Sequence, residues 1–189
     1  MSVRPGAPHT GIWFIRTDQA PPVRIAAHVQ NVSKRARRTS LKNGTFAIET
    51  VEHCLSACAG LGIDNLEIEL TGGELPSGDG SSLPFVESLR NAGIQEQEAD
   101  RKCYLIDDMV RVVDGDCERI ALPPLDPNSE VLEIAYDLDY GVGTIIGRQT
   151  YRVGITPESF EANIAPARTF VLEREAEELH GWTPEGRRW

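Results

Sequence analysis

Hydrophobic and polar positions alternate over several short segments of the chain, and each of these segments predicts a β-strand. The clearest is residues 66–70, where three apolar side chains alternate with two glutamates. A period of two places the apolar side chains on one face of a strand and the acidic ones on the face in water. Residues 12–16 and 23–32 also predict strands, and His28 falls within the second as an ordinary strand residue.

Turn sequences locate the remaining strands. Residues 38–49 predict a hairpin with Asn43-Gly44 as its turn, because Asn-Gly is a strong short signal for such a turn. The Asp114-Gly-Asp116 sequence lacks the other ligands of a calcium loop, so we expect a plain hairpin turn there. The strands predicted in the second half are residues 103–106, 109–113, 117–122, 131–136 and 149–155.

Start and stop residues mark the helices. Thr50 is the expected N-cap of a helix over residues 50–59, which Gly60 and Gly62 end. The other predicted helices are residues 83–92, with Pro84 near the start and Gly93 at the end, and residues 156–164 and 172–179. Strands and helices together indicate an α+β fold. The polar segment 95–102 suggests two units, at residues 1–97 and 102–189.

Composition excludes some classes of function. The chain has 189 residues, of which 40% are hydrophobic, and this is enough to bury a core. The formal net charge of -10 argues against a nucleic-acid-binding protein and leaves an acidic interaction domain as one class. The basic run over residues 34–38 is either a solvated loop or a phosphate contact. No segment resembles a signal peptide or a membrane span, so we expect a cytoplasmic protein.

The four cysteines form neither a CxxC motif nor a zinc-finger spacing. Cys54 and Cys58 lie four residues apart on one predicted helix, beside small apolar residues. We interpret them as buried thiols in a reducing compartment rather than as metal ligands or a redox pair.

Glu52 and His53 are the main candidates for chemistry. They lie in the first turn of the predicted helix, where a carboxylate beside an imidazole can bind a metal and move a proton. Adjacent side chains on a helix point about 100° apart, so one would bind the metal while the other faces a water molecule. Alone, this dipeptide is more typical of a surface or capping pair. Asp79, between two glycines, is either a turn carboxylate or a further site residue.

Several motifs, in order along the chain, change this interpretation. They are Thr50-Val-Glu-His53, the Ala-Gly-Leu-Gly-Ile-Asp-Asn sequence at 59–65, the Pro-Ser-Gly-Asp-Gly-Ser-Ser sequence at 76–82, and the Ile-Ala-Pro-Ala-Arg-Thr-Phe sequence at 164–170. In this combination the chain resembles the UDP-3-O-acyl-N-acetylglucosamine deacetylase family of lipid A biosynthesis. The resemblance runs from about residue 4 to residue 179.

The resemblance implies a zinc-dependent amidohydrolase that removes acetate from UDP-3-O-(3-hydroxyacyl)-N-acetylglucosamine. It implies that His53 binds Zn²⁺, that Glu52 is the general base, that Thr169 donates to the oxyanion of the tetrahedral intermediate, and that Phe170 lines the acyl-chain channel. It also implies two α+β units with helices packed between two sheets and the active site between the units. We expect this nucleotide sugar as the partner, no nucleic acid, no membrane segment and a monomer.

Two features of the family have no counterpart in this sequence. The family takes its other zinc ligands from a later His-Lys-x-x-Asp-x-x-Gly-Asp helix, and it opens with two strands around a Gly-x-Gly-Leu-His-type turn. The remaining candidates, His9, His28, His180 and Asp79, do not reproduce the missing spacing. We therefore expect a chain shortened at both ends, with an incomplete zinc site. The alternative is an inactive relic that keeps only part of the sugar-nucleotide and acyl binding surface.

Overall fold

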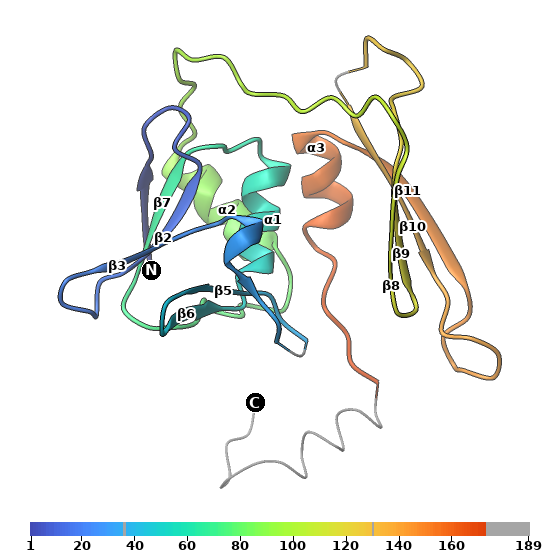
Figure 1. Cartoon of the computed structure of the whole chain (residues 1–189), viewed down its shortest axis with the longest axis horizontal. Helices are drawn as coiled ribbons and strands as arrows, with labels where there is room; N and C mark the ends of the chain where they lie inside the picture. The colour runs from blue at the N-terminus through green and yellow to red at the C-terminus, as the bar shows by residue number, and fades with distance from the viewer. Residues whose placement is uncertain (36, 130, 173–189) are drawn as a thin grey trace, which may run out of the picture.

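The computed structural model describes residues 1–35, 37–129 and 131–172. The first half is built on a four-stranded sheet in the order β1-β7-β2-β3 (Figure 1). β7 is parallel to β2, and the two outer pairs are antiparallel. These strands are β1 (Ser2–Pro5), β2 (Ile12–Arg16), β3 (Val23–Ala26) and β7 (Leu66–Leu70). The mixture of sheets and helices confirms the α+β class.

The alternation of apolar and acidic residues in β7 corresponds to a buried face and a polar face, as predicted. Its three apolar side chains are buried in the core, whereas Glu67 lies on the opposite face. Glu67 accepts a hydrogen bond from Arg4 Nε of β1 at 2.6 Å and also pairs with Arg24 of β3. The polar face of the sheet is therefore covered by ion pairs that join strands on both sides of β7, and the apolar face is left for the helices.

A three-stranded antiparallel sheet follows, made of β4 (Val32–Ser33), β5 (Ser40–Asn43) and β6 (Phe46–Glu49). The predicted hairpin is confirmed, but Asn43 pairs with Phe46, so the two turn residues are Gly44 and Thr45. The turn lies one position later than predicted. Gly44 has a φ of 59°, and this left-handed conformation is the reason why a glycine suits the first turn position.

The prediction of one strand over residues 23–32 is wrong in its second part. β3 ends at Ala26, and the chain then forms a 3-10 turn, η1 (Val29–Asn31). His28 caps this turn, because its Nδ1 accepts a hydrogen bond from the backbone N–H of Gln30 at 3.3 Å. His28 is therefore a capping residue and not a strand residue, since a local side-chain bond replaces the strand pairing that alternation alone suggested.

Two helices, α1 (Glu52–Gly60) and α2 (Leu83–Ala92), pack against each other. α2 ends at Gly93, with a φ of 85°, as predicted. Cys54 and Cys58 of α1 are free, buried thiols, which confirms their structural interpretation. The core is shared by both sheets and both helices, and its largest fully buried members include Phe14, Ile25, Leu41, Ile48, Val51, Ile68 and Val86.

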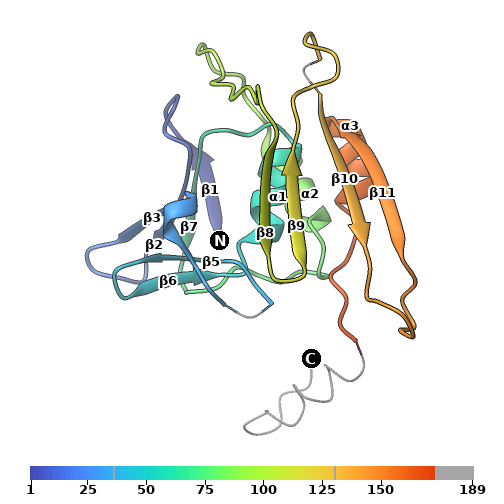
Figure 2. The same ribbon diagram turned by 45° about the vertical axis from the view of Figure 1, so that its right-hand side comes forward.

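The second half consists largely of two separate hairpins, β8 (Val110–Asp114) with β9 (Cys117–Ala121), and β10 (Leu132–Leu138) with β11 (Gln149–Ile155). The Asp-Gly-Asp sequence is a hairpin turn, as predicted. Residues 93–109 contain no helix or strand, so the strand predicted over 103–106 is wrong; its apolar side chains Tyr104 and Leu105 are exposed and have no strand to pair with. Figure 1 shows both hairpins on the side of the molecule opposite the four-stranded sheet, and in Figure 2 β8 and β9 lie in front of α1 and α2, with β10 and β11 to their right.

The chain after β11 returns to the first half. Thr156 and Ser159 form a capping box at the start of α3 (Pro157–Ser159), and a π-helical turn, η2 (Phe160–Ile164), continues it. Phe160 is buried in the core of the first half, which fixes the position of the residues that follow. The predicted helix over 172–179 extends outside the described residues.

Within the part of the chain that the structure describes, no helix is long and apolar enough to cross a membrane. The division into units at residues 1–97 and 102–189, and the packing of helices between two sheets, stay predictions.

Candidate active site

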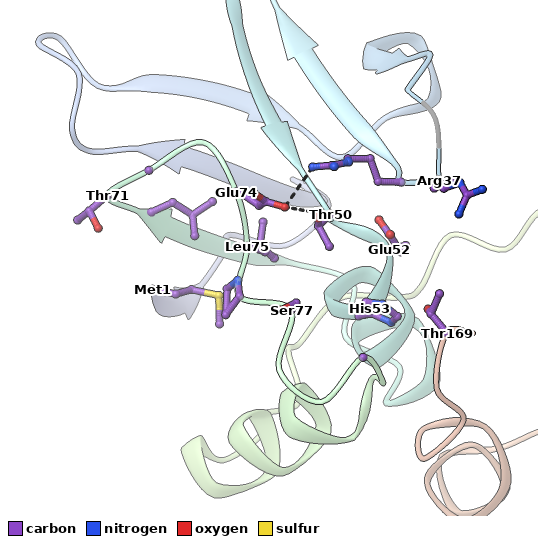
Figure 3. Close-up of a pocket in the computed structure, with 15 residues that line it drawn as sticks. Met1, Arg37, Thr50, Glu52, His53, Thr71, Glu74, Leu75, Ser77 and Thr169 are labelled. Atoms are coloured by element: carbon purple, nitrogen blue, oxygen red, sulfur yellow. Dashed lines mark hydrogen bonds and ion pairs between the residues drawn. The ribbon is translucent and has the colours of Figure 1, made fainter. Parts of the chain in front are cut away.

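An open cavity of about 780 Å³ lies at the start of α1 (Figure 3). Its wall comes from five parts of the chain: Met1, Arg37 and Arg38 of the basic run, the β6–α1 junction, the segment from Leu70 to Gly80, and Thr169. Glu52, His53 and Thr169 all line it. The structure therefore brings together three of the four site residues that the sequence predicts.

The junction between β6 and α1 differs from the prediction. Thr50 does not cap the helix; Val51 is the N-cap, and no side chain caps the first turn. Thr50 has a φ of 59°, a left-handed conformation that is unfavourable for a β-branched residue. Its Oγ1 instead donates a hydrogen bond to Glu74 Oε1 at 2.8 Å. The chain thus turns sharply at Thr50, and this turn directs the first residues of α1 into the cavity.

Two neighbouring segments hold this turn in place. Glu49 N–H donates to the carbonyl of Gly73 at 2.8 Å, and Leu75 N–H donates to the carbonyl of Glu49 at 3.2 Å. Arg38 Nη1 also lies 2.9 Å from Glu49 Oε2 and 3.3 Å from Glu74 Oε1. The left-handed residue is therefore fixed by backbone pairing on one side and by a charged cluster on the other.

Glu52 is oriented by the backbone. The N–H of Thr39 donates to Glu52 Oε2 at 3.0 Å, and the carbonyl of Thr39 accepts from Val51 N–H at 3.3 Å. A carboxylate has lone pairs on both oxygens, so one oxygen held in this way leaves the other able to accept a proton. A carboxylate held in this way is chemically able to act as a general base.

Thr169 reaches the cavity through two backbone hydrogen bonds. Its own N–H donates to the carbonyl of Gly80 at 2.9 Å, and Ser82 N–H donates to the carbonyl of Ala165 at 3.1 Å. Residues 165–169 are thus tied to residues 80–82 of the first half. Figure 3 shows Thr169 on this segment, next to the α1 turn that carries His53. A hydroxyl group from the second half is in this way placed in a cavity that the first half forms.

Asp79 organises the loop that accepts this segment. Its Oδ1 accepts from the Ser81 hydroxyl at 2.7 Å and from the Ser81 N–H at 3.0 Å. The Ser81 hydroxyl is the main cause that lowers the pKa of Asp79, and the nearby Arg168 also contributes. Asp79 is not among the residues that line the cavity. The interpretation of Asp79 as a turn carboxylate is therefore confirmed.

The described residues of the basic run, 34, 35, 37 and 38, are exposed, as expected of a solvated loop, but some of them also make contacts. Arg37 and Arg38 line the cavity, and Arg35 and Arg38 form ion pairs with Glu49. Positive charge thus lies at one wall of the cavity. A phosphate contact at this run stays a prediction.

Phe170 lies outside the cavity wall. Its side chain is 56% exposed, and its ring centroid is 6.3 Å from that of Tyr140, in the loop that joins β10 and β11. The predicted contact of Phe170 with an acyl chain is not tested by this geometry and stays a prediction.

The described residues do not complete a zinc site. Among them, no group of three His, Cys, Asp or Glu side chains can hold a metal ion. His53 is at the cavity, but His28 caps η1 and His9 lies in the exposed loop between β1 and β2. His180 lies outside the described residues. A structural or catalytic zinc ion needs three or four protein ligands, so His53 and Glu52 alone are not sufficient.

The two buried cysteines do not supply the missing ligands. Cys54 and Cys58 are in the core on the helix that begins with Glu52. A hydrogen bond with Cys58, together with burial, raises the pKa of the Cys54 thiol. Both side chains are buried, and neither lines the cavity, so neither thiol can join His53 as a ligand there.

Some of the residues that build this site could not be found from the sequence. The hydrogen bond to Glu52 comes from a main-chain N–H, which Thr39 provides whatever its side chain is. The contact between Thr50 and Glu74 joins residues 24 positions apart and depends on the bridge between Glu49 and Glu74. The only sequence signal in this region is the order of the motifs.

Comparison with known proteins identifies a family to which this chain is similar. The family model described as LpxC, UDP-3-O-acyl N-acetylglycosamine deacetylase, matches residues 1–183. Three curated proteins named UDP-3-O-acyl-N-acetylglucosamine deacetylase are similar over 95% of this chain. The protein from Pseudomonas entomophila is 38% identical over 180 residues, that from Myxococcus xanthus 38% over 179, and that from Marinobacter nauticus 39% over 180. The matched regions are 58%, 55% and 58% of these relatives, so the chain spans a little over half of their length.

Proposed function

The chain belongs to the UDP-3-O-acyl N-acetylglycosamine deacetylase family, and we propose that its cavity is part of a site that hydrolyses the N-acetyl group of UDP-3-O-acyl-N-acetylglucosamine. The products are UDP-3-O-acyl-glucosamine and acetate, in lipid A biosynthesis. The observation that supports this proposal most strongly is that Glu52, His53 and Thr169 line one cavity, although more than half of the chain separates the first two from the third.

The chemistry follows from the groups in the cavity. A water molecule attacks the acetyl carbonyl carbon, and the oxygen of Glu52 that Thr39 does not hold takes its proton. The carbonyl oxygen becomes negatively charged in the tetrahedral intermediate, and the Thr169 hydroxyl donates a hydrogen bond to it. When the C–N bond breaks, the proton held by Glu52 passes to the amine nitrogen, so acetic acid and a neutral amine are formed. The acetic acid then loses its remaining proton to solvent and leaves as acetate.

Zinc is the cofactor that the family resemblance implies, and His53 would be one of its ligands. Because the described residues contribute no set of three ligands, we propose that the complete site needs further ligands from outside them. We therefore expect weak zinc binding by the purified chain in a dialysis titration, and we expect His53→Ala to remove it. The matched control is His9→Asn, since His9 has a φ of 63°, a conformation that asparagine tolerates.

A second candidate function has support from the same observation. If the chain is a relic that retains only part of the nucleotide-sugar and acyl binding surface, the missing ligands need no replacement. The two candidates differ in acetate release from UDP-3-O-acyl-N-acetylglucosamine under a large excess of zinc, which would populate even a weak site. Acetate release above the rate without protein supports the hydrolase. Substrate binding without any acetate supports the relic.

We also propose that the protein is cytoplasmic and monomeric. We expect no nucleic acid as a partner, because the net charge is -10. Light scattering on the purified chain measures its oligomeric state directly.

A further inference from the structure

Two residues with a left-handed backbone lie in the wall of the cavity. Among the described residues, three that are not glycine have a positive φ: His9, Arg37 and Thr50. Arg37, with a φ of 61°, and Thr50, with a φ of 59°, both line the cavity, whereas His9 is not among the residues that do. This conformation is unfavourable for arginine and threonine and persists only where the surroundings fix it. Such strain in a cavity wall points to a functional requirement there.

The two strained turns meet at Glu52. Arg37 comes two residues before Thr39, whose N–H donates to Glu52 Oε2 at 3.0 Å. Thr50 comes two residues before Glu52 itself. The carbonyl of Thr39 also accepts a hydrogen bond from Val51 N–H at 3.3 Å, so the segments that follow the two turns are bonded to each other. The direction of the Glu52 carboxylate therefore depends on both turns being held in place together.

A single atom, Oε1 of Glu74, joins the two turns. It accepts a hydrogen bond from Thr50 Oγ1 at 2.8 Å, and Arg38 Nη1 lies 3.3 Å from it. Arg38 stands between Arg37 and Thr39, so its guanidinium ties the first turn to the same oxygen that holds the second. In Figure 3 the dashed lines of these two contacts meet at Glu74.

The Glu74 side chain contributes little to the stability of the fold. It is 56% exposed and that of Arg38 is 42% exposed, and ion pairs between exposed side chains contribute little free energy. Arg38 also lies 2.9 Å from Glu49 Oε2, and a backbone bridge between Glu49 and Glu74 holds the segment itself. Loss of the Glu74 carboxylate therefore leaves the fold in place and removes the link between the two turns.

We propose that Glu74 is a positioning residue for the hydrolysis: its carboxylate holds the Arg37 and Thr50 turns together and so directs Glu52 at the attacking water. This role rests on the proposed function, because it is defined by the general base that Glu52 supplies. Glu74 acts only through its contacts with Thr50 and Arg38. Glutamine should therefore replace it, since the amide oxygen still accepts from both groups, whereas alanine removes both contacts.

Amide hydrogen exchange on the full chain measures how firmly Glu52 is held, because the Thr39 N–H is the donor to it. We expect Glu74→Ala to speed exchange at Thr39 about tenfold or more relative to the amides of α2, and Glu74→Gln to change it by less than about threefold. The matched control is Glu67→Ala, which removes a glutamate with two arginine partners on the polar face of the sheet and should leave exchange at Thr39 unchanged.

Acetate release in excess zinc is the second measurement. Glu74→Ala should lower kcat about 10²-fold with little change in KM, because a catalytic group displaced by about 1 Å costs a factor of this size. Glu74→Gln and Glu67→Ala should keep kcat near that of the original protein.

Two results would overturn the role of Glu74: unchanged exchange at Thr39 in Glu74→Ala, or a fall in kcat no larger than in Glu67→Ala. If the original chain releases no acetate, the proposed function fails, and the exchange at Thr39 alone decides whether Glu74 holds Glu52.

Discussion

At the scale of single residues, the candidate site depends on a strained position. Thr50 has a left-handed φ of 59°, which costs an ordinary residue about 1–2 kcal/mol. Such a conformation persists only where the surroundings fix it. Here the hydroxyl of Thr50 binds Glu74, and the neighbouring Glu49 is paired with Gly73 and Leu75. This turn places Glu52 where the N–H of Thr39 can hold its carboxylate.

Two replacements of Thr50 distinguish the contribution of its hydroxyl group to stability from the cost of its backbone conformation. Thr50→Val keeps the shape and the strain but loses the hydrogen bond to Glu74, so the free energy of unfolding should fall by about 1 kcal/mol. Thr50→Gly also loses the bond, but the strain disappears with it, so stability should stay near that of the original protein. Urea unfolding of the two variants measures the difference. Equal stabilities would show that the Thr50 conformation carries no strain.

The Asp79 loop should give a pH-dependent contribution to stability. The Ser81 hydroxyl lowers the pKa of Asp79 in the folded state from its ordinary value of 3.8. The charged carboxylate therefore stabilises the fold above the unfolded pKa, and this contribution is lost as the pH falls through the lower folded pKa. Compared with Asp79→Asn, the original protein should keep a constant advantage above about pH 5 and lose it on further acidification. A gap between the urea midpoints that widens on acidification would contradict this sign.

At the scale of elements, η2 joins the two halves by close packing on α1. Phe160 is only 4% exposed, and a Cβ added at Gly60 would lie 2.2 Å from atoms of its ring. No side chain fits between them, so the glycine at the end of α1 allows the approach. This contact carries residues 165–169 to the cavity.

The Gly60→Ala variant compares two opposing effects on stability, the helix propensity of alanine and the loss of close packing with Phe160. Propensity alone favours alanine by about 1 kcal/mol, but forcing Phe160 out of place costs about 1–3 kcal/mol or more. We expect a net loss of stability in thermal unfolding, and faster amide exchange at Thr169. The matched control is Gly147→Ala, where a Cβ meets nothing within 4 Å and stability should change by less than about 0.5 kcal/mol. A stabilised Gly60→Ala variant would contradict the close packing.

Much of the element order follows from the sequence, because the strongest patterns are local. The period of two in Leu66–Leu70 and the glycine stop after Ala92 are both found in the structure. The predictions are wrong where a side-chain hydrogen bond, or the lack of a partner strand, determines the backbone conformation. His28 caps a turn inside an apparently continuous strand, and residues 103–106 have apolar side chains but no strand to pair with. At the site, motif order predicted Glu52, His53 and Thr169, whereas the backbone donor at Thr39 has no sequence signal.

At the scale of the whole molecule, the predicted division into units at residues 1–97 and 102–189 places the boundary inside the segment 93–109. Most of these residues are exposed, and none belongs to a helix or strand. Brief trypsin treatment should therefore cut first near Arg101 or Lys102. The two fragments should stay together in gel filtration without denaturant, because Phe160 is buried in the core of the first half. First cleavage within residues 12–70 would contradict this division.

The most direct test of the central claim, that the start of α1 is the reactive centre, is acetate release from UDP-3-O-acyl-N-acetylglucosamine in excess zinc with Glu52 altered. We expect Glu52→Gln to reduce the rate by about 10²–10⁴-fold, because the amide cannot accept the proton of the attacking water. Glu87→Gln, the same change at an exposed position of α2, should leave the rate unchanged. Acetate release that survives Glu52→Gln at the original rate would contradict the assignment.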